Sequence, residues 1–161
     1  MFLLILTNPK GIKATPLYQA FDRQEFYKIV KSGSTEAIDN EIALLNDGMI
    51  IERNAYIGTL LMKKASLVSQ PKYKLNLFKE GRIKLETAME SDSGNVEYHF
   101  LRLIIEEHAP KIVKYHSQLA ADARYVKQHF RKLPTVVQHA VLDYSKTSEI
   151  LSPENLKSTE E

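Results

Sequence analysis

The sequence predicts an all-α fold of about seven helices, stacked as antiparallel hairpins, and two observations lead to this prediction. First, the odd-numbered helices begin near Leu17, Asn54, Asn95 and Pro134, at intervals of 37, 41 and 39 residues. Near-constant spacing in this range is typical of helical repeat arrays. Second, the helix that starts at Asn95 is apolar on most sides, so several neighbouring helices must cover it, as in the middle of a stack.

The composition is that of a globular protein with one domain. The chain has 161 residues, of which 43% are hydrophobic and 26% charged, enough for a real core. A formal net charge of +2 gives no strong attraction to nucleic acid or to an anionic membrane. The chain has no cysteine, which excludes disulfides, thiolate metal sites and cysteine nucleophiles. No segment approaches the roughly 18 apolar residues of a membrane span.

We divide the chain into residues 1–14, a single helical-repeat domain over 15–151, and a polar tail over 152–161 that we expect to fray. Residues 1–14 open with the apolar run MFLLIL, and no basic segment precedes it. Two interpretations stay open: an N-terminal arm that packs onto the domain, or a degenerate export leader cleaved after Ala14. The first leaves the protein in the cytoplasm and the second sends it to the periplasm.

Local signals set the expected helices of the first half. Thr15 and Pro16 are a good helix start, and we expect that helix to end near Lys31, before SGS at 32–34. A second helix follows a Ser34 or Thr35 cap and ends at NDG, residues 46–48. The third helix covers about 54–69 and stops before Pro71. The fourth should turn its apolar residues inward, namely Leu75, Phe78, Ile83, Leu85 and Ala88.

The second half continues the pattern. The fifth helix begins at Asn95 and must stop before Pro110, because proline disfavours a helical residue before it. Ser117 can cap a sixth helix, and Pro134 opens a seventh. On a wheel of about 100° per residue, the polar residues of the fifth helix share one arc, which consists of Asn95, His99, Arg102 and Glu106.

Two stretches resemble the tetratricopeptide repeat. Residues 88–95 read AMESDSGN, similar to the ALELDPNN with which that repeat ends its second helix; Ala88, Asp92 and Asn95 match, and Ser93 replaces the proline. Residues 32–45, SGSTEAIDNEIALL, are similar to GDYDEAIEYYQKAL but one residue shorter, and the pattern of the first helix is absent. The resemblance implies a right-handed stack with a concave groove for peptides or partner helices, and no catalysis. The chain also has a general likeness to small helical proteins of the Bacteroidetes, which often carry export leaders.

Catalytic and metal-binding patterns are missing. The five histidines all lie in the C-terminal half, yet none has the H-E-x-x-H or Glu-x-x-His spacing that places two ligands on one helix face. No G-x-S-x-G, Walker or dinucleotide-binding motif occurs. We therefore expect no enzymatic activity, no metal and no cofactor.

Basic residues form two modest groups, Lys63 to Lys84 and Arg124 to Lys132. In the first group Glu80, Glu86 and Glu90 interrupt the stripe that a nucleic-acid binder would show, so we expect no nucleic-acid partner. Five tyrosines either line a ligand pocket between hairpins or pack in the core with their hydroxyls reaching water. These are Tyr56, Tyr98, Tyr115, Tyr125 and Tyr144.

The sequence thus favours a non-catalytic scaffold that binds a protein or peptide. If the first helices of the hairpins line a concave face, the contacts come from two matching arcs, Thr59, Lys63 and Ser66 on one and His99, Arg102 and Glu106 on the next. The alternative function is a carrier of a small apolar ligand in a cleft between hairpins.

Overall fold

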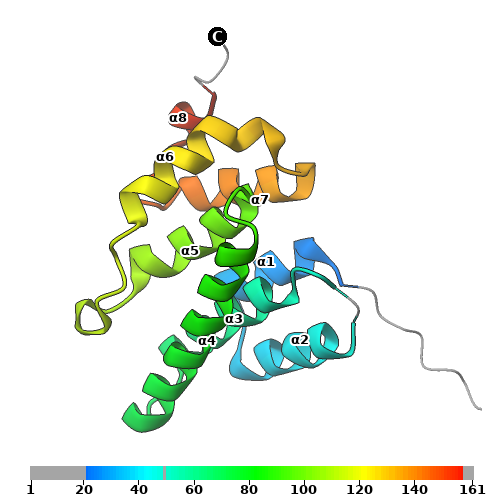
Figure 1. Cartoon of the computed structure of the whole chain (residues 1–161), viewed down its shortest axis with the longest axis vertical. Helices are drawn as coiled ribbons and strands as arrows, with labels where there is room; N and C mark the ends of the chain where they lie inside the picture. The colour runs from blue at the N-terminus through cyan, green and yellow to red at the C-terminus, as the bar shows by residue number, and fades with distance from the viewer. Residues whose placement is uncertain (1–20, 49, 158–161) are drawn as a thin grey trace, which may run out of the picture.

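The computed structural model of the chain describes residues 21–48 and 50–157, and it is helical throughout (Figure 1). These ranges contain eight α-helices, two short 3₁₀ helices and no strand, which confirms the all-α class. The α-helices are α1 (Arg23–Ser32), α2 (Thr35–Asp47), α3 (Arg53–Leu67), α4 (Pro71–Ser91), α5 (Val96–His108), α6 (Leu119–His129), α7 (Thr135–Ser145) and α8 (Pro153–Lys157). The 3₁₀ helices are η1 (Lys111–Val113) and η2 (Phe130–Lys132).

Local side chains and a proline define the starts of α2, α4 and α5. The Ser34 hydroxyl accepts a hydrogen bond from the Ala37 amide, and the Asn95 side chain accepts from the Glu97 and Tyr98 amides. Pro71 occupies the first turn of α4. Each of these residues satisfies or removes a backbone donor that a helix start leaves without a partner.

α1 and α6 begin at residues that the sequence signals did not indicate. α1 begins at Arg23, because the Asp22 carboxylate caps it by accepting from the Gln24 amide. The predicted start at Thr15 and Pro16 lies outside the described residues. α6 begins at Leu119 rather than after a Ser117 cap, and the amide of its N-cap residue, Gln118, donates to the Glu106 carboxylate of α5 at 3.1 Å.

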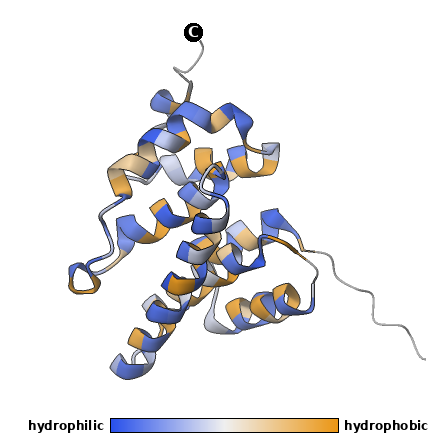
Figure 2. Ribbon diagram, in the orientation of Figure 1, coloured by the Kyte–Doolittle hydropathy of each residue, from blue (hydrophilic) through white to orange (hydrophobic). Residues whose placement is uncertain are grey.

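α5 separates two hydrophobic clusters, as its apolar sides predicted. Leu101 and Ile105 belong to a cluster with α1 to α4, whereas Phe100 and Leu103 belong to a second cluster with α6, α7 and α8. Hydrophilic and hydrophobic residues are interspersed along the helices (Figure 2). The two clusters share α5, so the helices on its two sides are held together through it.

The buried face of α4 differs from the predicted one. Phe78, Leu85 and Ala88 are buried, but Leu75 and Ile83 are 45% and 67% exposed. The reason is the close crossing with α3, where Gly58 faces Gly81. This crossing turns the face that carries Phe78, Gly81 and Leu85 towards α3 and leaves Leu75 and Ile83 outside it.

The first helix packs against the seventh. α1 contacts α7 as well as α2 and α3, and Lys31 Nζ lies 2.6 Å from the Asp143 carboxylate. In an open repeat array each unit touches only its neighbours. α1 and α7 are instead in contact although they are far apart in the sequence. Residues of both helices line the groove described below.

Residues 152–157, the described part of the predicted tail, differ from the expected fraying segment. Residues 153–157 form α8, and the Leu156 side chain has no exposed surface. Leu156 belongs to the second hydrophobic cluster, with Val137 and Val141 of α7. Burial of this leucine explains why a segment of otherwise polar composition is part of the fold.

Candidate functional site

A groove of about 1460 Å³ lies between α1, α3, α4, α5 and α7. We call it the cationic groove. Its residues are Gln24, Tyr27, Lys28, Val30, Lys31, Met62, Lys63, Ala65, Ser66, Pro71, Lys74, Leu75, Phe78, Lys79, Arg82, Phe100, Ile104, Ile105, His108, Ala109, Pro110, Ile112, Val113, Thr135, Val136, His139, Ala140, Asp143, Tyr144 and Thr147. It is therefore built from helices that are far apart in the sequence.

The floor of the cationic groove is apolar. Every helix that surrounds it contributes hydrophobic side chains, among them Val30, Met62, Phe78, Ile104 and Val136. Two large apolar residues that line the groove are also open to solvent, Leu75 at 45% and Ile112 at 88%. Exposed apolar surface of this kind, continuous with a groove, is characteristic of an interaction site.

α4 presents one continuous face to the groove. Its lining residues are Pro71, Lys74, Leu75, Phe78, Lys79 and Arg82, which follow the helical spacing i, i+3, i+4, i+7, i+8 and i+11. The acids that interrupt this segment in the sequence, Glu80, Glu86 and Glu90, do not line the groove. All charged residues on the groove face of α4 are therefore basic, although the sequence of this segment also contains acids.

The charged residues of the groove are six cations and one anion: Lys28, Lys31, Lys63, Lys74, Lys79, Arg82 and Asp143. On the α1 side the cations are paired, since Lys31 contacts Asp143 at 2.6 Å and Lys28 contacts Glu25 at 3.0 Å. The hydrogen bond from Lys31 lowers the pKa of Asp143, so this anion stays charged. This side of the groove is close to electrically neutral.

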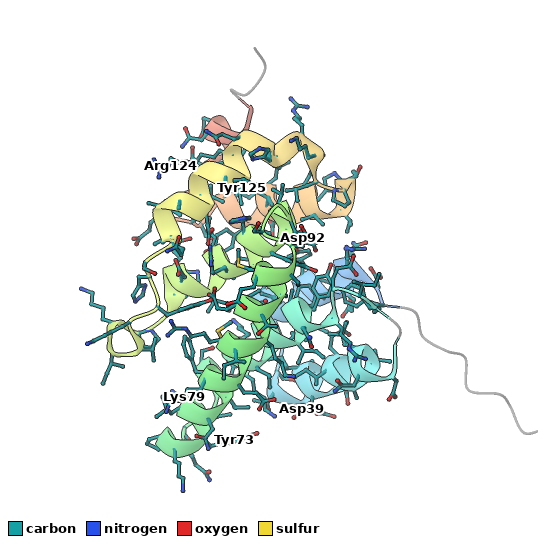
Figure 3. The ribbon with its side chains drawn as sticks, viewed as in Figure 1. Asp39, Tyr73, Lys79, Asp92, Arg124 and Tyr125 are labelled. Carbon is teal, nitrogen blue, oxygen red and sulfur yellow. The ribbon has the colours of Figure 1, made fainter. Side chains whose placement is uncertain are left out.

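The opposite wall, formed by α3 and α4, carries unpaired charge. Within residues 21–48 and 50–157, Lys63, Lys74 and Lys79 form no ion pair with a carboxylate. The Arg82 guanidinium lies 4.9 Å from the centre of the Tyr115 ring, a cation–π contact that leaves its charge in place. Figure 3 labels Lys79 on the lower half of α4. The unpaired positive charge of the groove therefore lies on the wall formed by α3 and α4.

The structure places the six predicted contact residues in three different environments. Lys63 and Ser66 line the cationic groove. Thr59, one turn earlier on α3, is fully buried and donates its hydroxyl hydrogen to the Ala55 carbonyl at 2.9 Å. The prediction that it belongs to the same contact surface is wrong, because its side chain has no exposed surface.

The arc of His99, Arg102 and Glu106 is also not an open surface, because α6 covers it. Asp122 of α6 is fully buried and accepts two hydrogen bonds from Arg102, at 2.7 and 2.9 Å, with His99 Nδ1 at 2.6 Å from its Oδ1. Arg102 also donates to Glu86 at 3.1 Å. These residues hold α6 on α5, so we correct their predicted role from partner contact to internal polar network.

Burial sets the ionisation of this network. Glu106 has no exposed surface, and desolvation raises its pKa, with the Gln118 amide as a smaller opposing influence. For Arg102, desolvation opposes the charged form, but the hydrogen bonds and charge of Asp122 outweigh it and raise the pKa. Arg102 thus keeps its charge, whereas Glu106 favours its neutral form more than an ordinary glutamate does.

Of the five tyrosines considered as pocket residues, one lines the groove. Tyr144 is that residue, and its hydroxyl donates to Glu107 at 2.5 Å. Tyr56, Tyr98 and Tyr115 are buried in the first hydrophobic cluster, and burial raises the pKa of Tyr98 to about 12. Tyr125 stacks between two histidines on α5 and α6. Core packing therefore accounts for most of them.

Over the described residues, no group of three or more histidines, cysteines or carboxylates is placed to hold a metal ion. The helices of the same ranges include none with the length and hydrophobicity needed to cross a membrane. No protein-family model, curated protein or solved structure matches this chain. The groove must accordingly be interpreted from its own geometry.

Proposed function

We propose that the chain is a non-catalytic binding module that holds a segment of another protein in the cationic groove. The observation that carries the proposal is a groove of about 1460 Å³ with an apolar floor. Sites for small molecules are about 300–1,000 Å³, so this groove is larger than a single small ligand requires. Apolar grooves between helices are a recurrent way to bind an amphipathic segment.

Two further features favour binding over catalysis. The Ser66 and Thr147 hydroxyls of the groove donate to the backbone carbonyls of Lys63 and Tyr144, and neither is hydrogen-bonded to a histidine or carboxylate that could activate it as a nucleophile. The groove hydroxyls of Tyr27 and Tyr144 do contact carboxylates, those of Glu97 and Glu107. The likeness of residues 32–45 and 88–95 to the tetratricopeptide repeat supports the same class of function. The alternative, a carrier of a small apolar ligand, would use the same floor.

The test compares two matched substitutions on α4. Leu75 and Ile83 are both exposed aliphatic residues, but Leu75 lines the groove and Ile83 does not. Peptides selected by the full-length protein from a random 16-residue display library are synthesised with a fluorescent label. Their dissociation constants are then measured by anisotropy with wild type, Leu75→Arg and Ile83→Arg.

We expect Leu75→Arg to weaken binding at least tenfold and Ile83→Arg to leave it within about twofold. If the library yields no binder, or both variants lose binding equally, the proposal is wrong. Native mass spectrometry of the freshly purified protein tests the alternative. A retained ligand of a few hundred daltons that Leu75→Arg releases would replace the peptide proposal with the carrier.

A further inference from the structure

We infer that the segment bound in the cationic groove is an amphipathic α-helix whose acidic edge faces the wall formed by α3 and α4. This inference rests on the proposed function and specifies the partner. It follows from three properties of the groove: the charge of each wall, the absence of a sheet edge, and the composition of the segments of this chain that could compete for the site.

The charge asymmetry requires an acidic partner with a defined orientation. Lys63, Lys74 and Lys79 are unpaired within the described residues, whereas the cations of the α1 wall are matched by Glu25 and Asp143. Carboxylates on a bound segment would therefore gain most along α3 and α4. Lys74 and Lys79 are five residues apart on α4, about 7.5 Å along the axis. Two acids at positions i and i+4 of a partner helix are separated by about 6 Å, a close match.

The backbone of the partner must supply its own hydrogen bonds. The groove is walled by helices and by the turn after α5, and the described residues contain no strand to which an extended peptide could add. An extended segment would leave amide and carbonyl groups without partners over the apolar floor, which costs free energy at each group. A helix satisfies these groups internally and places its apolar stripe on the floor.

Segments of the same chain are poor candidates for the groove. Residues 1–20 contain the apolar run MFLLIL, but their only charged side chains are Lys10 and Lys13, which the lysines of α4 would repel. The helix α2 of a second copy is acidic, yet its residues Ile38 and Leu45 are fully buried in their own core. It could not present an apolar stripe without unfolding.

The direct test uses three designed 18-residue peptides and the full-length protein. Two peptides share an apolar stripe of leucine and isoleucine and carry either glutamate or lysine along its edge. The third has the composition of the glutamate peptide in a scrambled order without a stripe. Dissociation constants are measured by anisotropy at 50 and 300 mM NaCl, with circular dichroism to follow helix formation by the peptide.

Matched charge reversals locate the acidic edge. Lys74→Glu with Lys79→Glu alters the groove wall, and Lys84→Glu with Lys132→Glu alters two lysines that do not line the groove. Both double variants change the formal net charge from +2 to −2, so any long-range effect of charge is the same. We expect the glutamate peptide to bind wild type at least tenfold tighter than the lysine or scrambled peptide, and less tightly at the higher salt.

We expect the groove double variant to weaken the glutamate peptide at least tenfold and to strengthen the lysine peptide, while the control double variant stays within threefold. Equal binding of both helical peptides, lost in Leu75→Arg, would overturn this inference and leave the proposed function standing. If the scrambled peptide bound as tightly as the glutamate peptide, the inference that the partner is an amphipathic helix would be wrong. A 20-nucleotide single strand that binds tighter than the glutamate peptide and depends on Lys74 and Lys79 would make nucleic acid the partner. If the protein self-associates and Leu75→Arg abolishes this self-association, the occupant of the groove would be a second copy of the chain.

Discussion

The Arg102 guanidinium holds the Asp122 carboxylate with two parallel hydrogen bonds, Nε to Oδ2 at 2.7 Å and a terminal nitrogen to Oδ1 at 2.9 Å. Arg102 lies on α5 and Asp122 on α6, and Asp122 has no exposed surface. Paired, hydrogen-bonded charges of this kind tolerate burial, but either partner left alone does not. The pair therefore fixes how α6 covers α5.

Removal of the Arg102 charge should destabilise the fold. Arg102→Met leaves the Asp122 carboxylate buried without its ion-pair partner, and we expect a loss of about 3–5 kcal/mol in the free energy of unfolding. Urea denaturation followed by circular dichroism measures it. Arg124→Met is the control, because Arg124 is exposed on the same α6 helix (Figure 3) and should change stability by about 0.5 kcal/mol or less. Equal effects of both substitutions would show that the buried pair does not hold α6.

The crossing of α3 and α4 predicts an intolerance to side chains at two glycines. A Cβ on Gly81 would lie 2.5 Å from the Gly58 carbonyl oxygen, and one on Gly58 would lie 2.6 Å from the Gly81 carbonyl oxygen. We expect Gly81→Ala to cost about 1–3 kcal/mol through overpacking, although alanine is the better helix former by about 1 kcal/mol. Thermal and urea unfolding measure the change.

Gly94 supplies the matched control for that substitution. A Cβ there would meet no atom closer than 3.8 Å, and its backbone does not have a positive φ. Gly94→Ala should therefore be neutral or stabilise the protein by about 0.4–1 kcal/mol, because alanine restricts the unfolded chain. A stable Gly81→Ala variant would contradict the close crossing of the two helices.

Two adjacent glutamates should have opposite effects on the pH dependence of stability. Burial raises the pKa of Glu106 in the folded state, so stability is lost as pH rises from the unfolded value of about 4.3 through the folded pKa. Glu106→Gln removes this titration. We expect the stability of this variant relative to wild type to be greater at pH 7.5 than at pH 4.5, as measured by urea denaturation at both pH values.

Ionisation of Glu107, unlike that of Glu106, should stabilise the folded protein. Burial opposes its charged form, but hydrogen bonds from Tyr144, Ser148 and the Glu149 amide outweigh burial and lower its pKa. The contribution of Glu107 to the free energy of unfolding is therefore present above the pKa of the unfolded state. It is lost as the pH falls through the pKa of the folded state. We expect Glu107→Gln to destabilise the protein by about 1–3 kcal/mol at pH 7.5 and less at acid pH. The same pH trend for both variants would contradict the assignment.

The last helix should contribute measurably to stability. Leu156 is fully buried in the second hydrophobic cluster, so Leu156→Ala should cost about 2–5 kcal/mol. Leu75→Ala removes the same atoms from a residue that is 45% exposed and should cost clearly less. If Leu156→Ala proves as mild as Leu75→Ala, residues 153–157 are not part of the folded core.

Capping and periodicity predicted much of the secondary structure because they act over a few residues. The Ser34 cap and the start of the fifth helix at Asn95 lie where the sequence indicated, and Pro71 follows the end of α3 as predicted. The apolar sides of α5 correctly predicted that helices cover it on both sides. The start of α6 was not predictable in this way, because the amide of its N-cap residue donates to Glu106, twelve residues before Gln118.

The residues of the candidate site could be predicted from the sequence only in part. Lys63 and Ser66 were predicted as contact residues and line the groove, but Thr59, Arg102 and Glu106 are buried. A helical wheel shows that these residues share a polar arc, and it does not show whether solvent or another helix meets that arc. The basic face of α4 had a signal in the spacing of Lys74, Phe78 and Arg82, which the neighbouring acids obscured.

By itself, the sequence determined the all-α class, the approximate extent of most helices and the place of α5 between two layers, since these depend on hydrogen bonds and periodicity within a few residues. The tertiary structure decided which faces are covered. The crossing of Gly58 with Gly81 turns one face of α4 inward, α1 packs on α7, which is more than 100 residues later in the chain, and the pairing of Arg102 with Asp122 covers the polar arc with α6. The cationic groove is the surface that these long-range contacts leave open.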